Sequence, residues 1–156
     1  MIRLVLVRHA KSDWGDAGLD DHERPLNDRG RRDAPRMARR LAETGFRPAS
    51  ILSSTAVRAR ATADAFAAEL GVAVSPDPGL YGAPAGVLLA SAAATRQPSV
   101  LVVAHDPGMS VLAGRLSDDG IGHMPTCAVA TFTWVVDDWD AVTALDPDEW
   151  TFDTPR

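Results

Sequence analysis

The chain of 156 residues is long enough to bury the core of one domain, and its net charge of −5 makes it a poor candidate for general nucleic-acid binding. Charged residues make up 24% of it, and no run of about 18 apolar residues occurs, so we expect a globular protein that does not cross a membrane. The single cysteine, Cys127, excludes an internal disulfide, and we expect a cytoplasmic monomer.

The N-terminal half begins with a strand over residues 2–7, IRLVLV, whose apolar run indicates burial on both faces. We interpret this run as a strand rather than as part of a signal peptide, because charge returns at once. A polar loop follows, from Arg8 to about Leu26. It contains an acidic cluster whose spacing fits no metal-ligand pattern, so we expect a solvated loop with His22 at the surface. The cluster consists of Asp20, Asp21 and Glu23.

A helix is predicted from Asn27, a suitable N-cap, to about Thr44. After a short strand over residues 49–53, Ser54 or Thr55 is expected to cap a second helix. The remaining elements alternate between strand and helix up to a closing hairpin. They are a helix over 56–70, a strand over 72–75, a loop over 76–86, a weak helix over 86–95, a buried strand over 99–104, a helix over 107–117, and strands over 128–136 and 139–145 with Asp137 and Asp138 at the turn.

This alternation predicts a single α/β domain over residues 1–156, with a mostly parallel central sheet between two layers of helices. Ligands of such sheets bind beyond the carboxyl ends of the strands, and three strands here end in polar groups. Arg8 and His9 follow the first strand, Arg58 lies just after the second, and His105 and Asp106 follow the strand over 99–104.

These side chains indicate a phosphate site. Arginine offers forked donors that match phosphate oxygens, and two of the three segments also open a helix, whose free N–H groups favour an anion. Histidine is the only evident nucleophile, since the sequence has no P-loop and no HExxH motif.

Four segments in the same order resemble the histidine phosphatase superfamily, and within it the short bacterial branch of phosphohistidine phosphatases similar to SixA. The hallmark of the superfamily is an Arg-His-Gly/Ala tripeptide after the first strand. The four segments are LVRHAKS at 6–12, ERPLNDRG at 23–30, SSTAVRARATA at 53–63 and VAHDPG at 103–108.

The resemblance implies a phosphoglycerate mutase-like fold and a phosphatase that needs no metal and no cofactor. By this likeness His9 is the nucleophile that becomes phosphorylated. Arg8 and Arg58 bind the phosphate, and His105 is the second histidine of the pocket. The implied partner is a phosphorylated substrate, for which we expect phosphohistidine in a protein.

Three residues keep open roles. Larger relatives use an acidic residue to protonate the leaving group, but residues 79–84 contain no Glu. Asp106 could be this proton donor or the N-cap of the following helix. Lys11 and Ser12 either line the mouth of the pocket and bind substrate or are ordinary loop residues.

Two rival functions follow from the same residues. One is a small-molecule phosphomonoesterase, and the other is a catalytically idle phosphate-binding domain. The intact set of Arg8, His9, Arg58 and His105 argues against the idle domain, and a substrate screen separates the two enzymes. A mutase is disfavoured by the short chain and the missing Glu.

Overall fold

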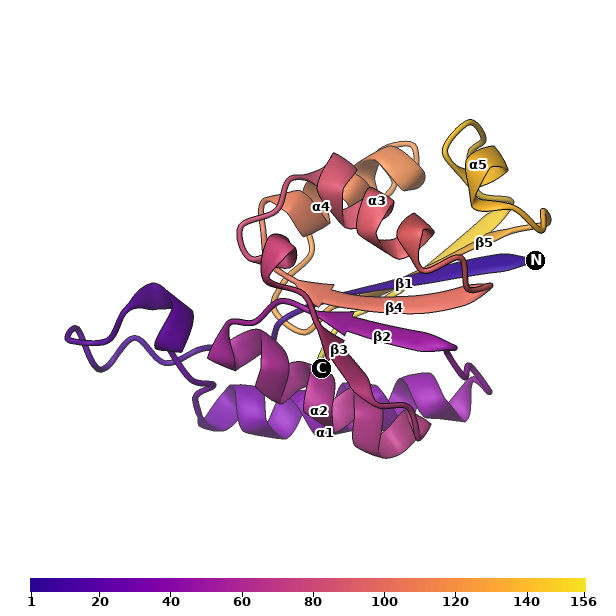
Figure 1. Cartoon of the computed structure of the whole chain (residues 1–156). Helices are drawn as coiled ribbons and strands as arrows, with labels where there is room; N and C mark the ends of the chain where they lie inside the picture. Colours follow the sequence, from indigo (N-terminus) through magenta and orange to yellow (C-terminus); the bar gives the residue numbers. More distant parts are fainter.

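The computed structural model describes residues 1–156, which form one six-stranded sheet with the order β3-β2-β4-β1-β5-β6 (Figure 1). The first four strands in the sequence run parallel, β5 is antiparallel to β1, and β6 is antiparallel to β5. The strands are β1 Ile2–Arg8, β2 Ser50–Ser53, β3 Val74–Pro76, β4 Ser99–Ala104, β5 Val129–Trp134 and β6 Glu149–Asp153.

Helices cover both faces of this sheet, with α1 and α2 on one side and α3 and α4 on the other (Figure 1). Two short 3₁₀ turns, η1 and η2, lie in the connecting loops. The bounds are η1 Asp21–Glu23, α1 Asp28–Glu43, α2 Val57–Leu70, η2 Pro78–Leu80, α3 Ala85–Ala94, α4 Gly108–Leu116 and α5 Trp139–Val142. None of these helices is both long and apolar enough to cross a membrane.

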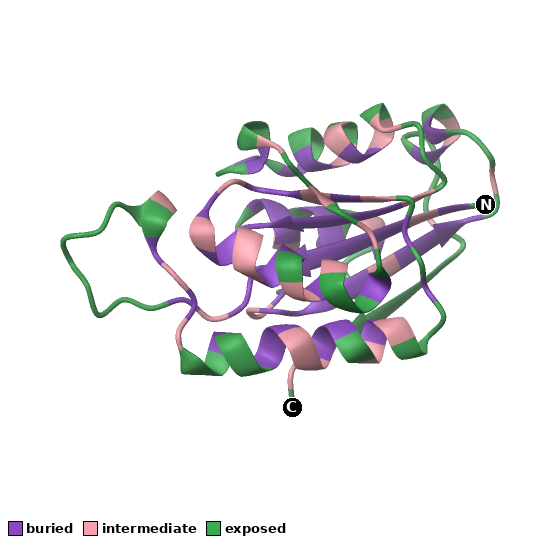
Figure 2. Ribbon diagram, turned by 60° about the horizontal axis from the view of Figure 1, so that its bottom comes forward, coloured by how far each residue is buried: buried purple, intermediate pink, exposed green.

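Each face of the sheet has its own hydrophobic core. Along β1, Leu4 and Leu6 belong to the cluster beneath α3 and α4, whereas Val5 and Val7 belong to the cluster beneath α1 and α2. The alternation of side chains along a strand therefore explains why the apolar run is unbroken. Most residues of the central strands β1 and β4 are buried (Figure 2). The predicted three-layer architecture with a mostly parallel sheet is confirmed.

The predicted helix ends are confirmed at α1 but not at the start of α2. Asn27 is the N-cap of α1, and its side chain accepts a hydrogen bond from the Gly30 N–H at 2.9 Å. The N-cap of α2 is Ala56, which has no capping side chain, so the predicted cap by Ser54 or Thr55 is wrong. The two hydroxyls bind histidines instead, as described below.

The predicted strand over residues 139–145 is also wrong. Residues Trp139–Val142 form the short helix α5, which starts where Asp138 accepts a hydrogen bond from the Asp140 N–H. Trp139 and Val142 are both buried, and their spacing of three is that of one helix face. The antiparallel partner of β5 lies later in the chain, at β6.

Candidate active site

The predicted site residues meet at the carboxyl ends of β1, β2 and β4. These ends are side by side, since Arg8 pairs with Ala104 and Ser53 pairs with Val103. The ring centroids of His9 and His105 are 5.1 Å apart. The sheet register alone therefore brings together groups that are almost a hundred residues apart in the sequence.

His9 is held as a neutral ring with one nitrogen free. Its Nδ1 lies 2.8 Å from the Ala10 carbonyl oxygen, which can only accept, so Nδ1 carries the proton. Burial is the main cause that lowers the pKa of His9 to about 3, with a further contribution from the charges of Arg58 and Arg8. A neutral ring protonated at Nδ1 leaves the lone pair of Nε2 available for nucleophilic attack.

The backbone around His9 is fixed from two sides. The Cys127 N–H donates to the carbonyl oxygens of both Arg8 and His9, at 3.0 Å each, from a residue with a φ of 61°. On the other side, the Ala10 N–H donates to Thr62 Oγ1 at 2.9 Å, and this hydroxyl donates to the Arg58 carbonyl oxygen. His9 and the start of α2 are thus tied together.

His105 is positioned by the hydroxyl that was expected to cap α2. Its Nε2 lies 2.7 Å from Ser54 Oγ, while its Nδ1 is buried with no hydrogen-bond partner. Burial is the main cause that lowers its pKa to about 4, and the charge of Arg58 acts in the same direction. When the Ser54 hydroxyl donates to Nε2, the proton of the neutral ring is on Nδ1 and can be offered to an anion.

The two arginines are anchored by their terminal nitrogens and keep further donors free. Arg8 Nη1 donates to the Met124 carbonyl oxygen at 2.9 Å. Arg58 is buried, and it donates to the backbone oxygen of Asp21 at 2.6 Å and to its carboxylate at 2.9 Å. Six buried side-chain nitrogen or oxygen atoms lack a partner, and three of them are Arg8 Nε, Arg58 Nε and His105 Nδ1. Buried unpaired donors are costly, so their concentration here indicates a place for an anion.

Asp106 supports this arrangement from the side of α4. Its carboxylate accepts hydrogen bonds from the Ser110 N–H and the Ser110 hydroxyl, and it lies 3.5 Å from Arg8 Nη1. The N-cap of α4 is Pro107, so the predicted cap by Asp106 is wrong, although the Asp106 side chain still accepts from an N–H of the first turn. This contact and the ion pair with Arg8 favour a positioning role of Asp106 over that of a proton donor.

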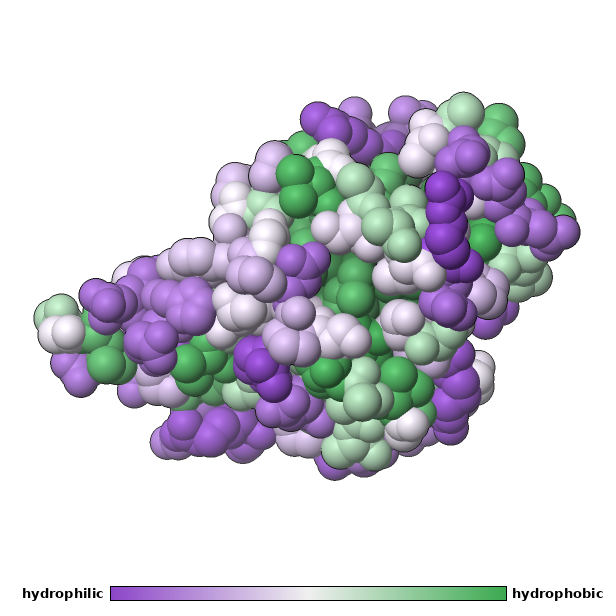
Figure 3. Space-filling view, viewed as in Figure 1, coloured by the Kyte–Doolittle hydropathy of each residue, from purple (hydrophilic) through white to green (hydrophobic).

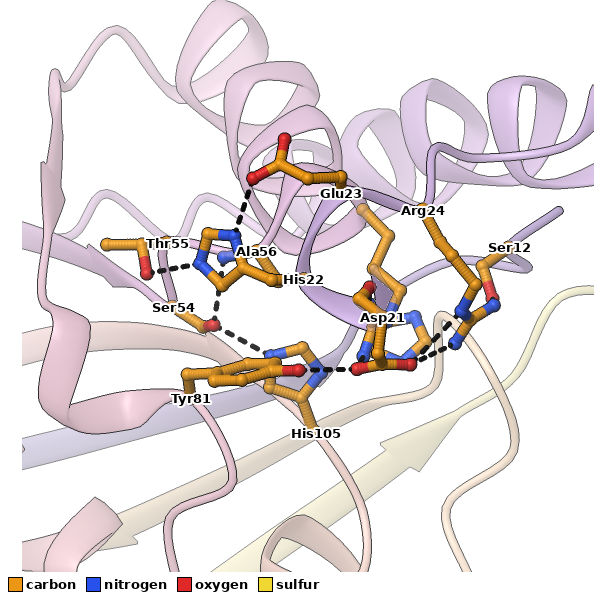
Figure 4. Close-up of polar contacts among 12 residues, drawn as sticks. Ser12, Asp21, His22, Glu23, Arg24, Ser54, Thr55, Ala56, Tyr81 and His105 are labelled. Carbon is orange, nitrogen blue, oxygen red and sulfur yellow. Dashed lines mark hydrogen bonds and ion pairs between the residues drawn. The ribbon is translucent and has the colours of Figure 1, made fainter. Parts of the chain in front are cut away.

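A second layer of residues, which we call the rim, lies beside His105: Asp21, His22 and Tyr81 (Figure 4). The Tyr81 hydroxyl donates to the Asp21 carboxylate at 2.6 Å, and the Tyr81 ring meets those of His22 and His105 edge to face. His22 Nε2 lies 2.8 Å from Thr55 Oγ1. The hydrogen bond from Tyr81, followed by those from Arg58 and Arg24, holds the pKa of Asp21 far below its usual range.

The rim was not predicted. The sequence suggested a solvated acidic loop with a surface histidine, whereas Asp21 is paired with Arg58 and His22 is partly buried. The close approach of α4 to the loop of Tyr81 depends on Gly108, where a Cβ would lie 2.1 Å from the Ala83 carbonyl oxygen. The segment at 23–30, which contains Arg24 and resembles the superfamily, indicated that this loop matters. It did not indicate which residues pair with Asp21.

Comparison with known proteins decides the family. The model of the histidine phosphatase superfamily (branch 1) matches residues 4–88, which is more than half of the chain. The chain belongs to this superfamily. Its fold is accordingly the phosphoglycerate mutase-like fold that the resemblance implied.

Solved structures of histidine phosphatases resemble the whole chain. A protein of Agrobacterium tumefaciens named as a candidate phosphohistidine phosphatase SixA is 31% identical, with a TM-score of 0.79 over 85% of this chain and 92% of that one. Its counterpart from Nakamurella multipartitia is 25% identical, with a TM-score of 0.86 over 99% and 96%. A protein histidine phosphatase SixA solved with tungstate is 23% identical, with a TM-score of 0.78 over 98% and 95%, and shows the shared fold.

Two curated relatives match over shorter stretches. An uncharacterized chloroplastic protein of Arabidopsis thaliana is 46% identical over 68 residues, which are 44% of this chain and 31% of that protein. The mitochondrial serine/threonine-protein phosphatase Pgam5 of Drosophila yakuba is 41% identical over 61 residues, which are 39% and 20%. The matched stretches thus span less than a third of each relative.

The two remaining predicted residues, Lys11 and Ser12, lie at the base of the loop. The Ser12 hydroxyl is buried and accepts a hydrogen bond from Arg24 Nη1 at 2.7 Å. The backbone of Lys11 accepts from Asn27 and approaches Gly30 so closely that a Cβ there would lie 2.1 Å from the Lys11 oxygen. Ser12 therefore holds the two ends of the loop together, whereas Lys11 contacts the start of α1. No group of three or more His, Cys, Asp or Glu side chains is arranged to hold a metal ion.

Proposed function

We propose that this histidine phosphatase hydrolyses phosphohistidine in a protein by way of a phosphoryl group carried on Nε2 of His9. The observation that carries the proposal is the neutral His9 ring, with Nε2 free, beside unpaired buried donors of Arg8, Arg58 and His105. A nucleophile, a set of oxyanion donors and a strand-end position together support phosphoryl transfer.

In the first step, the lone pair of His9 Nε2 attacks phosphorus, and a P–N bond forms while the bond to the leaving group breaks. The proton stays on His9 Nδ1, which donates it in a hydrogen bond to the Ala10 carbonyl oxygen, so the phosphorylated ring carries a positive charge next to the phosphoryl group. Water then attacks the same phosphorus, releases inorganic phosphate and returns His9 to its neutral form. Positive charge on Arg8 and Arg58 stabilises the phosphoryl oxygens in both transition states.

The leaving group decides the substrate class that we favour. The buried part of the site holds Asp106 as its only carboxylate, and this group is engaged by Ser110 and Arg8. A site without a free acid suits a substrate that departs without much protonation by the enzyme. The nitrogen of a phosphohistidine can be protonated before reaction, whereas the oxygen of an alkyl phosphate needs a proton as it leaves. The SixA names of similar structures point the same way.

The proposal is tested by a substrate screen that spans phosphohistidine peptides, sugar phosphates and nucleotides, with the His9→Ala protein as the blank. We expect phosphohistidine peptides to give the highest kcat/KM, activity to persist in EDTA, and tungstate to inhibit. A higher kcat/KM on a small phosphate ester than on the phosphohistidine peptides would instead indicate a small-molecule phosphomonoesterase. Phosphate binding without turnover of any compound would indicate an idle domain.

A further inference from the structure

The loop over residues 13–24 projects from the body of the molecule at the end of the sheet that carries the site (Figure 1). Its surface is mostly hydrophilic but bears apolar groups at its tip (Figure 3). Trp14 is 69% exposed and Leu19 is 40% exposed. An exposed tryptophan beside an active site is a typical contact residue for another protein, because its large ring gives much of the binding energy of an interface.

The exposed indole packs against a buried arginine of the same loop. The guanidinium carbon of Arg24 lies 3.5 Å from the centroid of the Trp14 ring, a cation–π contact. Two Asx turns shape the loop, since Asp13 accepts from the Gly15 N–H and Asp16 from the Gly18 N–H. A side chain that is ordered in advance loses less entropy when a partner binds.

The same loop is connected to the phosphate pocket. Arg24 is buried, donates to Ser12 Oγ at 2.7 Å and forms an ion pair with Asp21 at 3.1 Å. The carboxylate of Asp21 in turn accepts a hydrogen bond from Arg58 Nη2. A partner that touches Trp14 is therefore next to residues that position a phosphate-binding arginine.

The charge of the loop indicates what kind of partner fits. Residues 13–23 contain five carboxylates and no Lys or Arg, whereas the pocket beyond them presents Arg8 and Arg58. A free phosphate of high negative charge meets repulsion on its way in. A phosphoryl group that is flanked by basic side chains is attracted twice: the basic side chains by the loop carboxylates, and the phosphoryl group by Arg8 and Arg58.

We propose that the loop over residues 13–24 is a docking surface for a protein substrate whose phosphohistidine is flanked by basic and apolar side chains. The apolar neighbours pack on Trp14 and Leu19, and the basic ones face the loop carboxylates. This inference rests on the proposed function and names the surroundings of its substrate.

Three probes test it: free phosphohistidine, a phosphohistidine peptide flanked by Lys and Leu, and the same peptide with Glu in place of Lys. The quantity compared is the ratio of kcat/KM for the Lys/Leu peptide to kcat/KM for free phosphohistidine. We expect this ratio to fall at least tenfold in Trp14→Ala, mainly through KM. Asp20→Lys should lower this ratio and reduce the difference in kcat/KM between the Lys peptide and the Glu peptide. Asp20 is suitable because its side chain makes no capping hydrogen bond.

The control is Trp150→Ala, which removes a partly exposed tryptophan on β6 and should leave the ratio at its wild-type value. Thermal melts of each variant confirm that the fold is kept. An unchanged ratio in both Trp14→Ala and Asp20→Lys, with all three probes hydrolysed, would overturn the docking surface alone. Failure of the wild type on all three probes would instead overturn the proposed function, and the inference with it.

Discussion

The floor and the rim of the site are built in different ways. The floor, which consists of Arg8, His9 and His105, comes from the ends of β1 and β4 and is fixed by the sheet and by backbone hydrogen bonds. The rim comes from two loops and is held by side-chain contacts such as that between Tyr81 and Asp21. The difference indicates that the sheet positions the groups proposed to act on phosphorus, whereas the two loops influence which substrates reach those groups.

Burial separates the two regions as well. The histidines of the floor are buried and held neutral, with pKa values lowered to about 3 for His9 and about 4 for His105. In the rim, the Asp21 side chain is 50% exposed, so solvent screens its ion pair with Arg58. We therefore expect substitutions in the floor, and of Arg58 that serves it, to cost more activity than substitutions in the rim.

The largest effects should follow from removing the donors around the phosphoryl group. Arg58→Ala and His105→Ala should each lower kcat by roughly 10²–10³, the usual scale for one charge-stabilising donor. Steady-state kinetics on a phosphohistidine peptide give the values, and Arg39→Ala, at an exposed arginine of α1, serves as the control. A loss of less than threefold in Arg58→Ala would mean that this arginine does not face the phosphate.

Removing the carboxylate of the rim should have a smaller effect. Asp21→Ala deprives Arg58 of one of its two anchors while the backbone contact remains, so we expect kcat/KM to fall about tenfold, mostly through KM. Asp21→Asn keeps an acceptor for Tyr81 and should recover part of the loss. Equal losses in the two variants would show that charge, rather than positioning, is what Asp21 contributes.

Asp106 tests whether the floor contains a proton donor. Because Asp106 binds the first turn of α4 and anchors Arg8, we expect Asp106→Asn to slow phosphate esters with good and poor leaving groups by the same modest factor, about threefold. The measurement is a series of aryl phosphates with leaving groups of different pKa. A much larger slowing of the poor leaving groups would assign Asp106 the role of general acid.

Much of the floor could be predicted from the sequence because it depends on local patterns. The apolar runs of β1 and β4 fix two buried parallel strands, and their ends place Arg8, His9 and His105 at one edge. The rim could not be predicted in this way. The partners of Asp21 depend on how a long loop folds back over α2, and no periodic pattern encodes that path.

Two errors in the secondary structure have the same origin. The segment from Trp139 was predicted as a strand, but it is a short helix. A single helical turn forms there because Asp138 caps it and Val142 is buried, and alternation of apolar residues does not distinguish such a short turn from a strand. The hydroxyls of Ser54 and Thr55 were predicted as caps from local preference. In the fold they face His105 and His22, which arrive from elsewhere in the chain.

A separate expected effect concerns the dependence of stability on pH. Since the folded state keeps His9 and His105 neutral, the unfolded state binds more protons between the folded values of about 3 and 4 and the ordinary value of 6.5. Stability should therefore fall as the pH drops through this window, with a slope of at most about 1.4 kcal/mol per pH unit for each histidine. Urea unfolding at pH 7 and pH 5 measures the change.

The matched control for this prediction is His9→Gln, which removes one of the two buried titrating rings. Its urea midpoint should depend less on pH than that of the wild type. The depressed pKa of Asp21 adds a loss in the same direction, but only below the ordinary pKa of an aspartate, so it lies outside the interval compared. Stability that rises from pH 7 to pH 5 would contradict the neutral histidines of the floor.

The central claim is that His9 Nε2 carries the phosphoryl group, and trapping that intermediate tests it most directly. Wild-type protein mixed with a phosphohistidine peptide is quenched within milliseconds in alkali, where phosphohistidine is stable, and the phosphate is located by mass spectrometry and by ³¹P NMR. We predict one phosphate per chain, on Nε2 of His9, lost in acid and absent from His9→Ala. A phosphate on any other residue, or full activity in His9→Ala, would contradict the account.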